Sequence, residues 1–286
     1  MNFPLFPIGQ DPGPNFMRLL EQSGVSILEA HHASSNPQLN VPHGTTIIAI
    51  RYQDGVVMAG DRRATEGHAI AHRRIEKVHP ADLYSGVAIA GAAGPAMELV
   101  KLFQTQLQHY EKVEGTKLSL EGKANQLSHM VRSNLAMAMQ GLVVVPLFAG
   151  YDLEAKRGRI YTYDVTGGRY EEIDYQATGS GGRDARTTIK LGFRDDLSRN
   201  DVITLAIQAL YEAADEDSAT GGPDIIRGIF PTVASVTEEG FQRVDDDEVS
   251  EVFNLLIGNR QSARSNRPIQ GPKVRSAKST SSRSKT

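Results

Sequence analysis

Two short β-rich runs joined by a tight turn constrain the fold of this chain more than any other feature. The runs are Thr45–Ile50 and Val56–Ala59, and the turn residues Gln53-Asp54-Gly55 lie between them. Apolar runs of this length on either side of a turn are typical of a β-hairpin. The hairpin favours antiparallel sheets and disfavours the strict alternation of strand and helix that builds a parallel Rossmann sheet.

The remaining segments come as strands in groups and helices in pairs. Apolar runs predict further strands at residues 87–90, 146–151, 159–165 and 230–236. Apolar residues at helical spacing predict helices from Gly94, after Ser119, and at residues 184–191, 201–214 and 246–257. The helix after Ser119 is expected to bury a stripe made of Leu127, Met130, Val131, Leu135, Ala138 and Met139. We therefore expect one α+β domain over residues 45–260, with helices covering antiparallel sheets.

The two ends of the chain differ from this domain. Residues 1–44 hold six of the 13 prolines and one short helix-like patch, Phe16–Leu20, and we interpret them as a leader segment. Residues 261–286 contain seven Lys or Arg and no Asp or Glu, whereas residues 1–260 carry 24 Lys or Arg against 34 Asp or Glu. A Ser-, Arg- and Lys-rich segment cannot bury enough apolar surface to fold. We expect a disordered basic tail on an acidic body; a tail that contacts nucleic acid or an acidic partner is the alternative.

The composition excludes several classes of function. The chain has no cysteine, which rules out disulfides, thiolate nucleophiles and cysteine-based metal sites. No apolar run approaches the roughly 18 residues that span a bilayer, and the chain begins without the basic start and apolar stretch of a signal peptide. An acidic body also lacks the clustered basic face that nucleic-acid binding needs. We expect a cytoplasmic protein that binds neither membrane nor nucleic acid.

Two further patterns are interpreted as non-functional. His68 and His72 lie four residues apart but have no third ligand in sequence reach, so no metal site is expected. The Gly-rich run 179–182 lacks both the lysine of a phosphate-binding loop and the spacing of a dinucleotide fingerprint. No nucleotide, metal or other cofactor is therefore expected.

The residues that could best carry out catalysis surround the junction Gly44-Thr45-Thr46. If the chain were cut before Thr45, the hydroxyl of Thr45 could act as the nucleophile. The α-amine of the same residue, with an ordinary pKa of about 7.7 to 8.0, could act as the base. Such a threonine needs a nearby cation, and Lys77 with Asp61 as its partner could supply one. Taken singly, each of these residues is better explained as a strand start, a turn residue or a solvated charge.

The combination of motifs resembles the β-subunits of the proteasome, in particular the bacterial, actinobacterial-type branch. The resemblance rests on residues 45–49, 60–65, Lys77, 89–94, 178–181 and 217–224, and it covers residues 45–260. It implies a four-layer α/β/β/α sandwich of the N-terminal nucleophile hydrolases. It also implies a precursor that cuts itself between Gly44 and Thr45, so that residues 1–44 are a propeptide.

The resemblance also assigns roles to residues of this chain. Thr45 is the implied nucleophile, Lys77 tunes its amine, Asp61 holds Lys77, and the Gly91 backbone N–H stabilises the oxyanion. The implied supporting polar groups around the amine are Ser180, Asp217 and Thr220, where the family commonly has serine at the last position. Thr65 is implied to contact substrate, and the implied pocket beside Thr45 consists of Ala64, Ile75, His79, Ile89, Ala93 and Met97.

As a member of such a family the chain would be a threonine endopeptidase for unfolded polypeptides. Its implied partners are further copies in homo-heptameric β rings, stacked α-subunit rings and a regulatory ATPase ring. A related bacterial protease of the heat-shock-locus type is a first alternative, but it carries Gly-Asp-Gly-Gln where this chain has Gly60-Asp61-Arg62-Arg63. A catalytically silent ring subunit is the second, but such subunits lack one or more of the threonine, aspartate and lysine.

Overall fold

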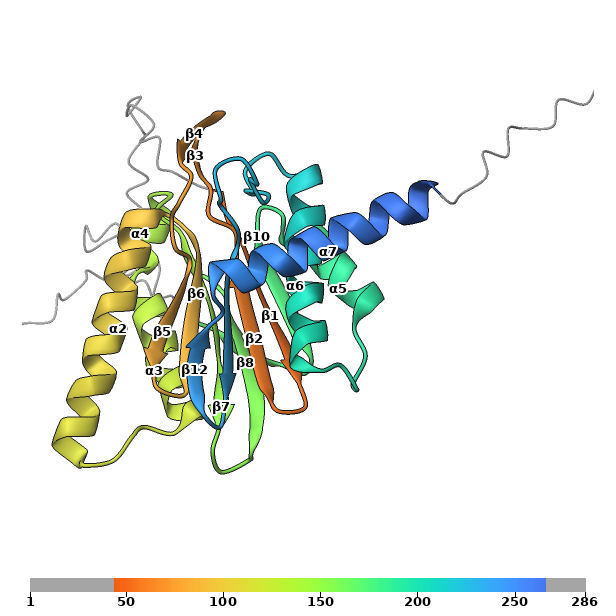
Figure 1. Ribbon diagram of the computed structural model, residues 1–286. Coiled ribbons are helices and arrows are strands. Elements are labelled where there is room, and N and C mark those ends of the chain that lie inside the picture. The colour runs from red at the N-terminus through yellow and green to blue at the C-terminus, as the bar shows by residue number, and fades with distance from the viewer. Residues whose placement is uncertain (1–43, 266–286) are drawn as a thin grey trace, which may run out of the picture. The chain divides into compact units, whose positions relative to one another are not determined.

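The computed structural model describes residues 44–265, and two five-stranded antiparallel sheets form its centre (Figure 1). The first sheet has the order β10-β1-β2-β11-β12, with bounds Tyr175–Gly179, Thr46–Tyr52, Gly55–Gly60, Thr232–Thr237 and Gly240–Arg243. The second has the order β5-β6-β7-β8-β9, with bounds Val78–Asp82, Ser85–Gly91, Val144–Asp152, Arg157–Tyr163 and Arg169–Glu172. A small two-stranded sheet pairs β3 (Ala64–Glu66) with β4 (Ala69–His72).

Helices cover the outer face of each five-stranded sheet. The helices α2 (Ala93–Glu114) and α3 (Leu120–Ser133) pack on the second sheet, and α5 (Gly182–Gly192) and α6 (Arg199–Glu216) pack on the first. The last helix, α7 (Asp246–Ser265), lies against α6, and α4 (Leu135–Met139) is a single short turn (Figure 1). The expected α+β sandwich with the layers α/β/β/α is confirmed.

Strand β1 shows why the first sheet is buried on both faces. Successive side chains of a strand point to opposite faces. Ile47 and Ala49 therefore pack between the two sheets, whereas Ile48 and Ile50 pack against α5 and α6. All four side chains are fully buried. A run without polar alternation is the sequence signature of such a strand, because neither of its faces meets water.

Strand pairing brings three distant segments to one edge of the first sheet. Thr46 pairs with Gly179 of β10, and Ile47 pairs with Gly60 of β2. The residue before β1 therefore lies near the residues that follow β2 and β10, namely Asp61 and Ser180. The antiparallel hairpin of β1 and β2 was expected from the sequence and is confirmed.

Several sequence-based expectations for single elements are wrong. The helix after Ser119 ends at Ser133, because the chain bends at Asn134 and restarts as α4, and Met139 is 82% exposed instead of buried. The strand expected at residues 159–165 ends at Tyr163, and Val165 lies exposed in a turn. The final helix continues past Gln261, where the tail was expected to begin, to Ser265. The patch at residues 16–20 and residues 266–286 lie outside the described residues.

Candidate active site

Asp61 and Lys77 form a buried ion pair directly below the start of β1. Their Oδ1 and Nζ atoms lie 2.6 Å apart, and Asp61 is fully buried. The Asp61 carboxylate also accepts hydrogen bonds from the backbone N–H groups of Thr46 at 2.7 Å, Arg63 at 2.9 Å and Gly221 at 2.8 Å. A buried carboxylate with this many donors is held in one position, which in turn holds the lysine.

The Lys77 ammonium uses its remaining donors on two backbone carbonyls. It donates to Arg63 O at 2.6 Å and to Gly44 O at 3.0 Å. Burial lowers the pKa of Lys77 below its ordinary value, while the charge and hydrogen bond of Asp61 oppose that shift. The structure thus places a desolvated cation against the carbonyl oxygen of the residue before Thr45.

Thr45 is 5% exposed and contacts the same carbonyl. Its hydroxyl donates to Gly44 O at 2.6 Å, and its backbone N–H donates to Ser180 Oγ at 3.4 Å. Gly44 has φ +137°, and a Cβ there would lie 2.6 Å from Thr65 Oγ1. A residue with a side chain would be strained in this backbone conformation and would collide with Thr65. The junction expected to be cleaved is therefore built around a glycine.

A chain of hydroxyl groups connects β1 to Asp217. The Asp217 carboxylate accepts from Ser180 Oγ at 2.5 Å and from Thr220 Oγ1 at 2.6 Å. Since the Thr220 proton goes to Asp217, Thr46 Oγ1 donates to Thr220 Oγ1 at 2.6 Å and accepts from the Gly181 N–H at 3.0 Å. Burial alone would raise the pKa of Asp217, but the Ser180 and Thr220 hydrogen bonds outweigh it and lower that pKa.

Gly91 ends β6 beside the same cavity. It has φ +115°, and a Cβ there would lie 2.1 Å from the carbonyl oxygen of Val143. The N–H of Ile89 donates to Lys77 O on the β5 side, and the N–H of Ala92 donates to Val143 O on the β7 side. Because N–H groups alternate in direction along a strand, that of Gly91 is directed to the β5 side, as that of Ile89 is.

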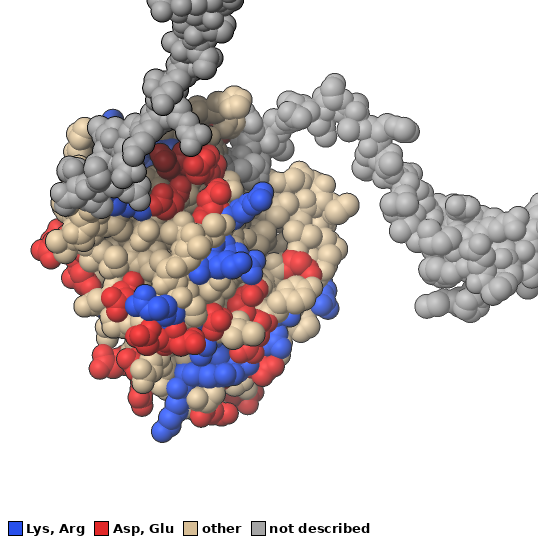
Figure 2. All heavy atoms as spheres, turned by 90° about the vertical axis from the view of Figure 1, so that its right-hand side faces the viewer, with Lys and Arg blue, Asp and Glu red and all other residues tan. Residues whose placement is uncertain are grey.

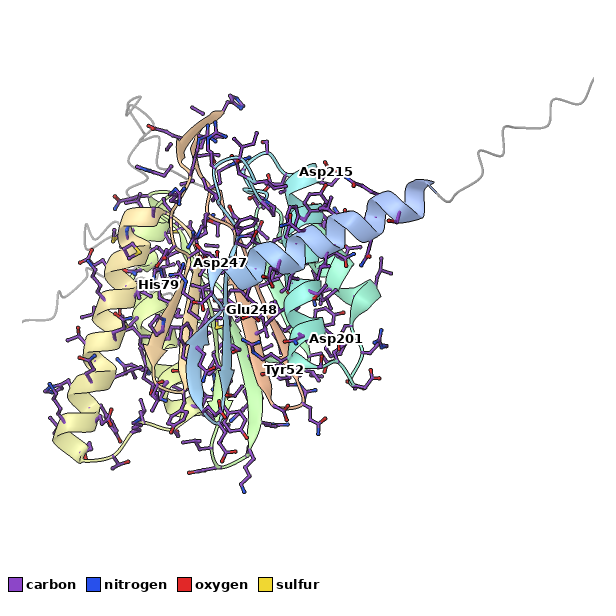
Figure 3. All side chains as sticks on the ribbon, viewed as in Figure 1. Tyr52, His79, Asp201, Asp215, Asp247 and Glu248 are labelled. Atoms are coloured by element: carbon purple, nitrogen blue, oxygen red, sulfur yellow. The ribbon has the colours of Figure 1, made fainter. Side chains whose placement is uncertain are left out.

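A pocket opens next to Thr45 and Gly91. Its wall contains all six residues that the resemblance implied: Ala64, Ile75, His79, Ile89, Ala93 and Met97. His79 lies on β5 beside α2 (Figure 3), and burial lowers its pKa. Met97 is 37% exposed because it faces this cavity and not the helix–sheet core. The predicted site residues are thus gathered in one place, with Thr65 buried next to Gly44.

Sequence reasoning missed several residues of this site. Thr46 and Gly221 supply hydrogen bonds to the hydroxyl chain and to Asp61, and the Arg63 carbonyl accepts from Lys77. Glu76 and Ala96 also line the pocket. Backbone donors and acceptors leave no mark on residue type, and Gly221 lies 160 positions from Asp61 in the sequence, so its contact could not be predicted from its neighbours in the chain.

The described part of the chain shows neither a metal site nor a membrane-spanning helix. No group of three or more His, Cys, Asp or Glu side chains among residues 44–265 is arranged to hold a metal ion. No helix in that range is long and apolar enough to cross a membrane. The face that lies at the right of Figure 1 shows acidic and basic side chains interspersed (Figure 2).

A family model and the similar relatives that we compared all point to the same protein family. The family model described as "Proteasome subunit" matches residues 41–227. A protein named proteasome subunit beta from Acidimicrobium ferrooxidans is 60% identical over 249 residues, covering 87% of this chain and 91% of the relative. Proteins of the same name from Streptomyces griseus and Frankia casuarinae are 56% and 51% identical to this chain. Each alignment covers 87% of this chain, and they cover 90% and 92% of the two relatives, respectively. With this similarity and the four-layer fold, the chain belongs to the proteasome subunit family.

Proposed function

We propose that this chain is a threonine endopeptidase, the β-subunit of a proteasome core particle, made as a zymogen and activated by cleavage between Gly44 and Thr45. The observation that carries the proposal is the convergence of the Thr45 hydroxyl and the Lys77 ammonium on the Gly44 carbonyl oxygen, at 2.6 Å and 3.0 Å. A nucleophile and a buried cation next to one peptide carbonyl are what acyl transfer requires.

Self-processing is an N-to-O acyl shift followed by hydrolysis. The Thr45 Oγ attacks the Gly44 carbonyl carbon and its proton passes to the Thr45 nitrogen, so that the C–N bond breaks and an ester forms. Lys77 stabilises the negative charge that develops on the Gly44 oxygen during this step. Water then attacks the ester, releasing the Gly44 carboxylate and leaving Thr45 with a free hydroxyl and a free amine.

The same atoms then hydrolyse peptide bonds. The Thr45 amine accepts the Oγ proton, Oγ attacks the substrate carbonyl carbon, and the Gly91 N–H stabilises the oxyanion. Collapse of this intermediate protonates and releases the amine product, and water hydrolyses the remaining acyl ester. Lys77 keeps the neighbouring amine unprotonated through like-charge repulsion. Ser180, Asp217 and Thr220 orient the amine through the hydroxyl chain.

The pocket beside Thr45 supports a role in substrate selection. Its wall is mostly apolar, with His79 as a titratable residue and small Ala64 and Ala93 side chains that leave space. Lys77 also borders this pocket, but its ammonium charge is already paired with Asp61 and its Nζ also donates to Arg63 O, at 2.6 Å each. We expect peptides with large apolar or aromatic residues before the cleaved bond to be preferred over acidic ones.

The family of the chain supports the proposed partners. We propose homo-heptameric β rings stacked with α-subunit rings, served by a regulatory ATPase ring, in the cytoplasm, with unfolded polypeptides as substrates. The extent of the mature protein is part of the same proposal: residues 1–44 are the propeptide, and the catalytic domain runs from Thr45 to the end of α7 at Ser265, with the basic tail after it. The Arg62-Arg63 pair after Asp61 argues against the heat-shock-locus type.

Labelling with an electrophile that reacts with N-terminal threonine tests the proposal against a silent scaffold subunit. We expect mass spectrometry of the assembled protein to find a mature chain that begins at Thr45 and carries one label on that residue. Lys77→Ala is expected to lose the label because the cation is gone, and to keep the assembled particle because the Asp61 carboxylate retains its three backbone N–H donors. An intact chain that begins at Met1 and takes no label would refute the proposal.

A further inference from the structure

Arg62 and Glu76 stand beside the two residues of the buried ion pair. Arg62 follows Asp61 and Glu76 precedes Lys77. The segments that carry them are joined by a backbone hydrogen bond from the N–H of Ile75 to Arg62 O, at 3.1 Å. Consecutive side chains of an extended chain point in opposite directions. The pair of segments therefore has the Asp61–Lys77 contact on one side and the side chains of Arg62 and Glu76 on the other.

Four charged side chains form a closed ring on that second side. The Arg62 guanidinium lies 3.6 Å from Glu76 and 3.3 Å from Asp246. Arg243 lies 2.6 Å from Glu76 and 3.7 Å from Asp246. Charges alternate around this ring, which we call the Arg62 ring, so each acid is shared by two guanidinium groups. The ring is not part of the catalytic chemistry proposed above.

Burial makes the Arg62 ring more than a set of surface contacts. The Arg62 side chain is only 7% exposed, and its Nε also donates to Thr232 Oγ1 at 3.1 Å. A buried guanidinium that loses a partner is strongly destabilising, so its partners have to stay in place. The other three members are about half-exposed, and such pairs contribute little on their own. Their effect is exerted through the position of Arg62.

The elements joined by the Arg62 ring lie far apart in the sequence. Asp246 is the first residue of α7, next to Asp247 and Glu248, which are labelled in Figure 3. Arg243 is the last residue of β12, and Thr232 is the first of β11. The ring therefore ties the two segments of the ion pair to the end of the first sheet and to the start of the last helix.

We propose that the Arg62 ring is a positioning device that fixes the separation of Asp61 and Lys77, and that Arg243 is a positioning residue of this site. The inference rests on the proposed function. Catalysis of this kind requires the Lys77 ammonium to stay within hydrogen-bond distance of both Asp61 and the reacting group, and small displacements of catalytic groups lower rates steeply. Arg243 belongs neither to the pocket nor to the ion pair, so its substitution loosens the ring without removing a group from either.

The test compares Arg243→Gln with the matched control Arg199→Gln. Arg199 pairs with Glu248 at 3.2 Å, so both variants remove one arginine that binds an acid on the first turn of α7, but Arg199 is not in the ring. We measure kcat and KM for a peptide, the labelling rate of Thr45 by a small electrophile, and the midpoint of thermal unfolding. Both variants are expected to shift the unfolding midpoint by similar amounts.

Only Arg243→Gln is expected to lower kcat and the labelling rate, by about threefold to tenfold each, with KM unchanged. Equal losses in both variants, a change confined to KM, or wild-type rates in Arg243→Gln would overturn the inference while leaving the proposed function intact. A wild-type protein that takes no label on Thr45 would instead refute the proposed function, and the inference with it.

Discussion

The Nζ of Lys77 lies 2.6 Å from Oδ1 of Asp61 inside the protein, and the same ammonium reaches the carbonyl oxygen of Gly44 at 3.0 Å. This relationship links the charge pair to the bond that is proposed to be cut. Because Asp61 is fixed by three backbone N–H groups, Lys77 cannot leave the carbonyl without breaking a buried ion pair.

Replacing Thr45 with alanine is expected to prevent removal of residues 1–44. Alanine has no hydroxyl to attack the Gly44 carbonyl, and the Lys77 group that also contacts this carbonyl is an ammonium without a lone pair. Mass spectrometry of assembled Thr45→Ala particles should find the full chain. A mature chain that begins at residue 45 in this variant, without active neighbours or a contaminating protease, would contradict self-processing.

Gly44→Ala is expected to slow processing at least tenfold. The φ of +137° is unfavourable for alanine, and its Cβ would lie 2.6 Å from Thr65 Oγ1, so the carbonyl has to move away from Lys77 and the Thr45 hydroxyl. The time course of propeptide loss measures this effect. As a control, Gly94→Ala adds a Cβ where no atom lies within 4 Å and should process at the wild-type rate.

Lys77→Arg is expected not to restore the activity lost in Lys77→Ala. A planar guanidinium cannot occupy the compact position of an ammonium that donates to Asp61 Oδ1 and to Arg63 O, each at 2.6 Å. Peptide turnover by both variants checks this. Substantial turnover by Lys77→Arg would mean that any positive charge suffices.

The pH dependence follows from the pKa of Lys77. Burial lowers that pKa below its ordinary value of 10.5, with Asp61 opposing, so the activity that needs the ammonium should fall on the alkaline side before pH 10.5. In Asp61→Asn the opposing charge is gone, and the alkaline limb of the Thr45 labelling rate should move to lower pH. Between the folded pKa and 10.5 the unfolded chain binds the extra proton, so the free energy of unfolding of the wild type should rise with pH.

If the alkaline limb of the Thr45 labelling rate lies at the same pH in the wild type and in Asp61→Asn, a group other than Lys77 controls that limb. The free Thr45 amine governs the acid limb, near its ordinary pKa of about 7.7 to 8.0 or below because Lys77 repels its charged form. The two limbs can be separated in one pH–rate profile, since substitution of Asp61 should shift the alkaline limb more.

Enlarging the pocket wall at Ala93 is expected to change specificity. Ala93→Phe adds a ring to the pocket beside Thr45 and should suppress cleavage after aromatic residues more than cleavage after alanine. Labelling of Thr45 by a small electrophile should persist, because the reacting atoms are untouched. Equal loss for both substrate types, or an unchanged profile, would place Ala93 outside the substrate pocket.

The sequence predicted those parts of the fold that depend on local apolar patterns. The hairpin of β1 and β2 and the helices α2, α5 and α6 all have continuous or periodic apolar residues. It missed β9, whose sequence Arg169–Glu172 is mostly charged, because an edge strand held by cross-strand ion pairs has no hydrophobic alternation. It also missed the break at Asn134, since a helical pattern continued across it.

The candidate site likewise contains residues that the sequence predicts and residues that it does not. Thr45, Asp61 and Lys77 are residue types that chemistry can single out, and motif spacing groups them. Arg62 and Glu76 are typical surface charges by sequence, and their meaning depends on Arg243 and Asp246, which lie more than 160 positions further along the chain. Contacts between residues so far apart in the sequence can be identified only when the pairing of the strands is known.

The position of the Gly44 carbonyl also predicts the kinetic order of the proposed activation. In the precursor this carbonyl already contacts both the Thr45 hydroxyl and Lys77, so each folded chain holds its own first substrate. Such an intramolecular reaction has an effective concentration that no added peptide can match. Activation should therefore be a first-order event whose rate is unaffected by dilution of the folded particle and by competing substrates, and each subunit would acquire its amine only once.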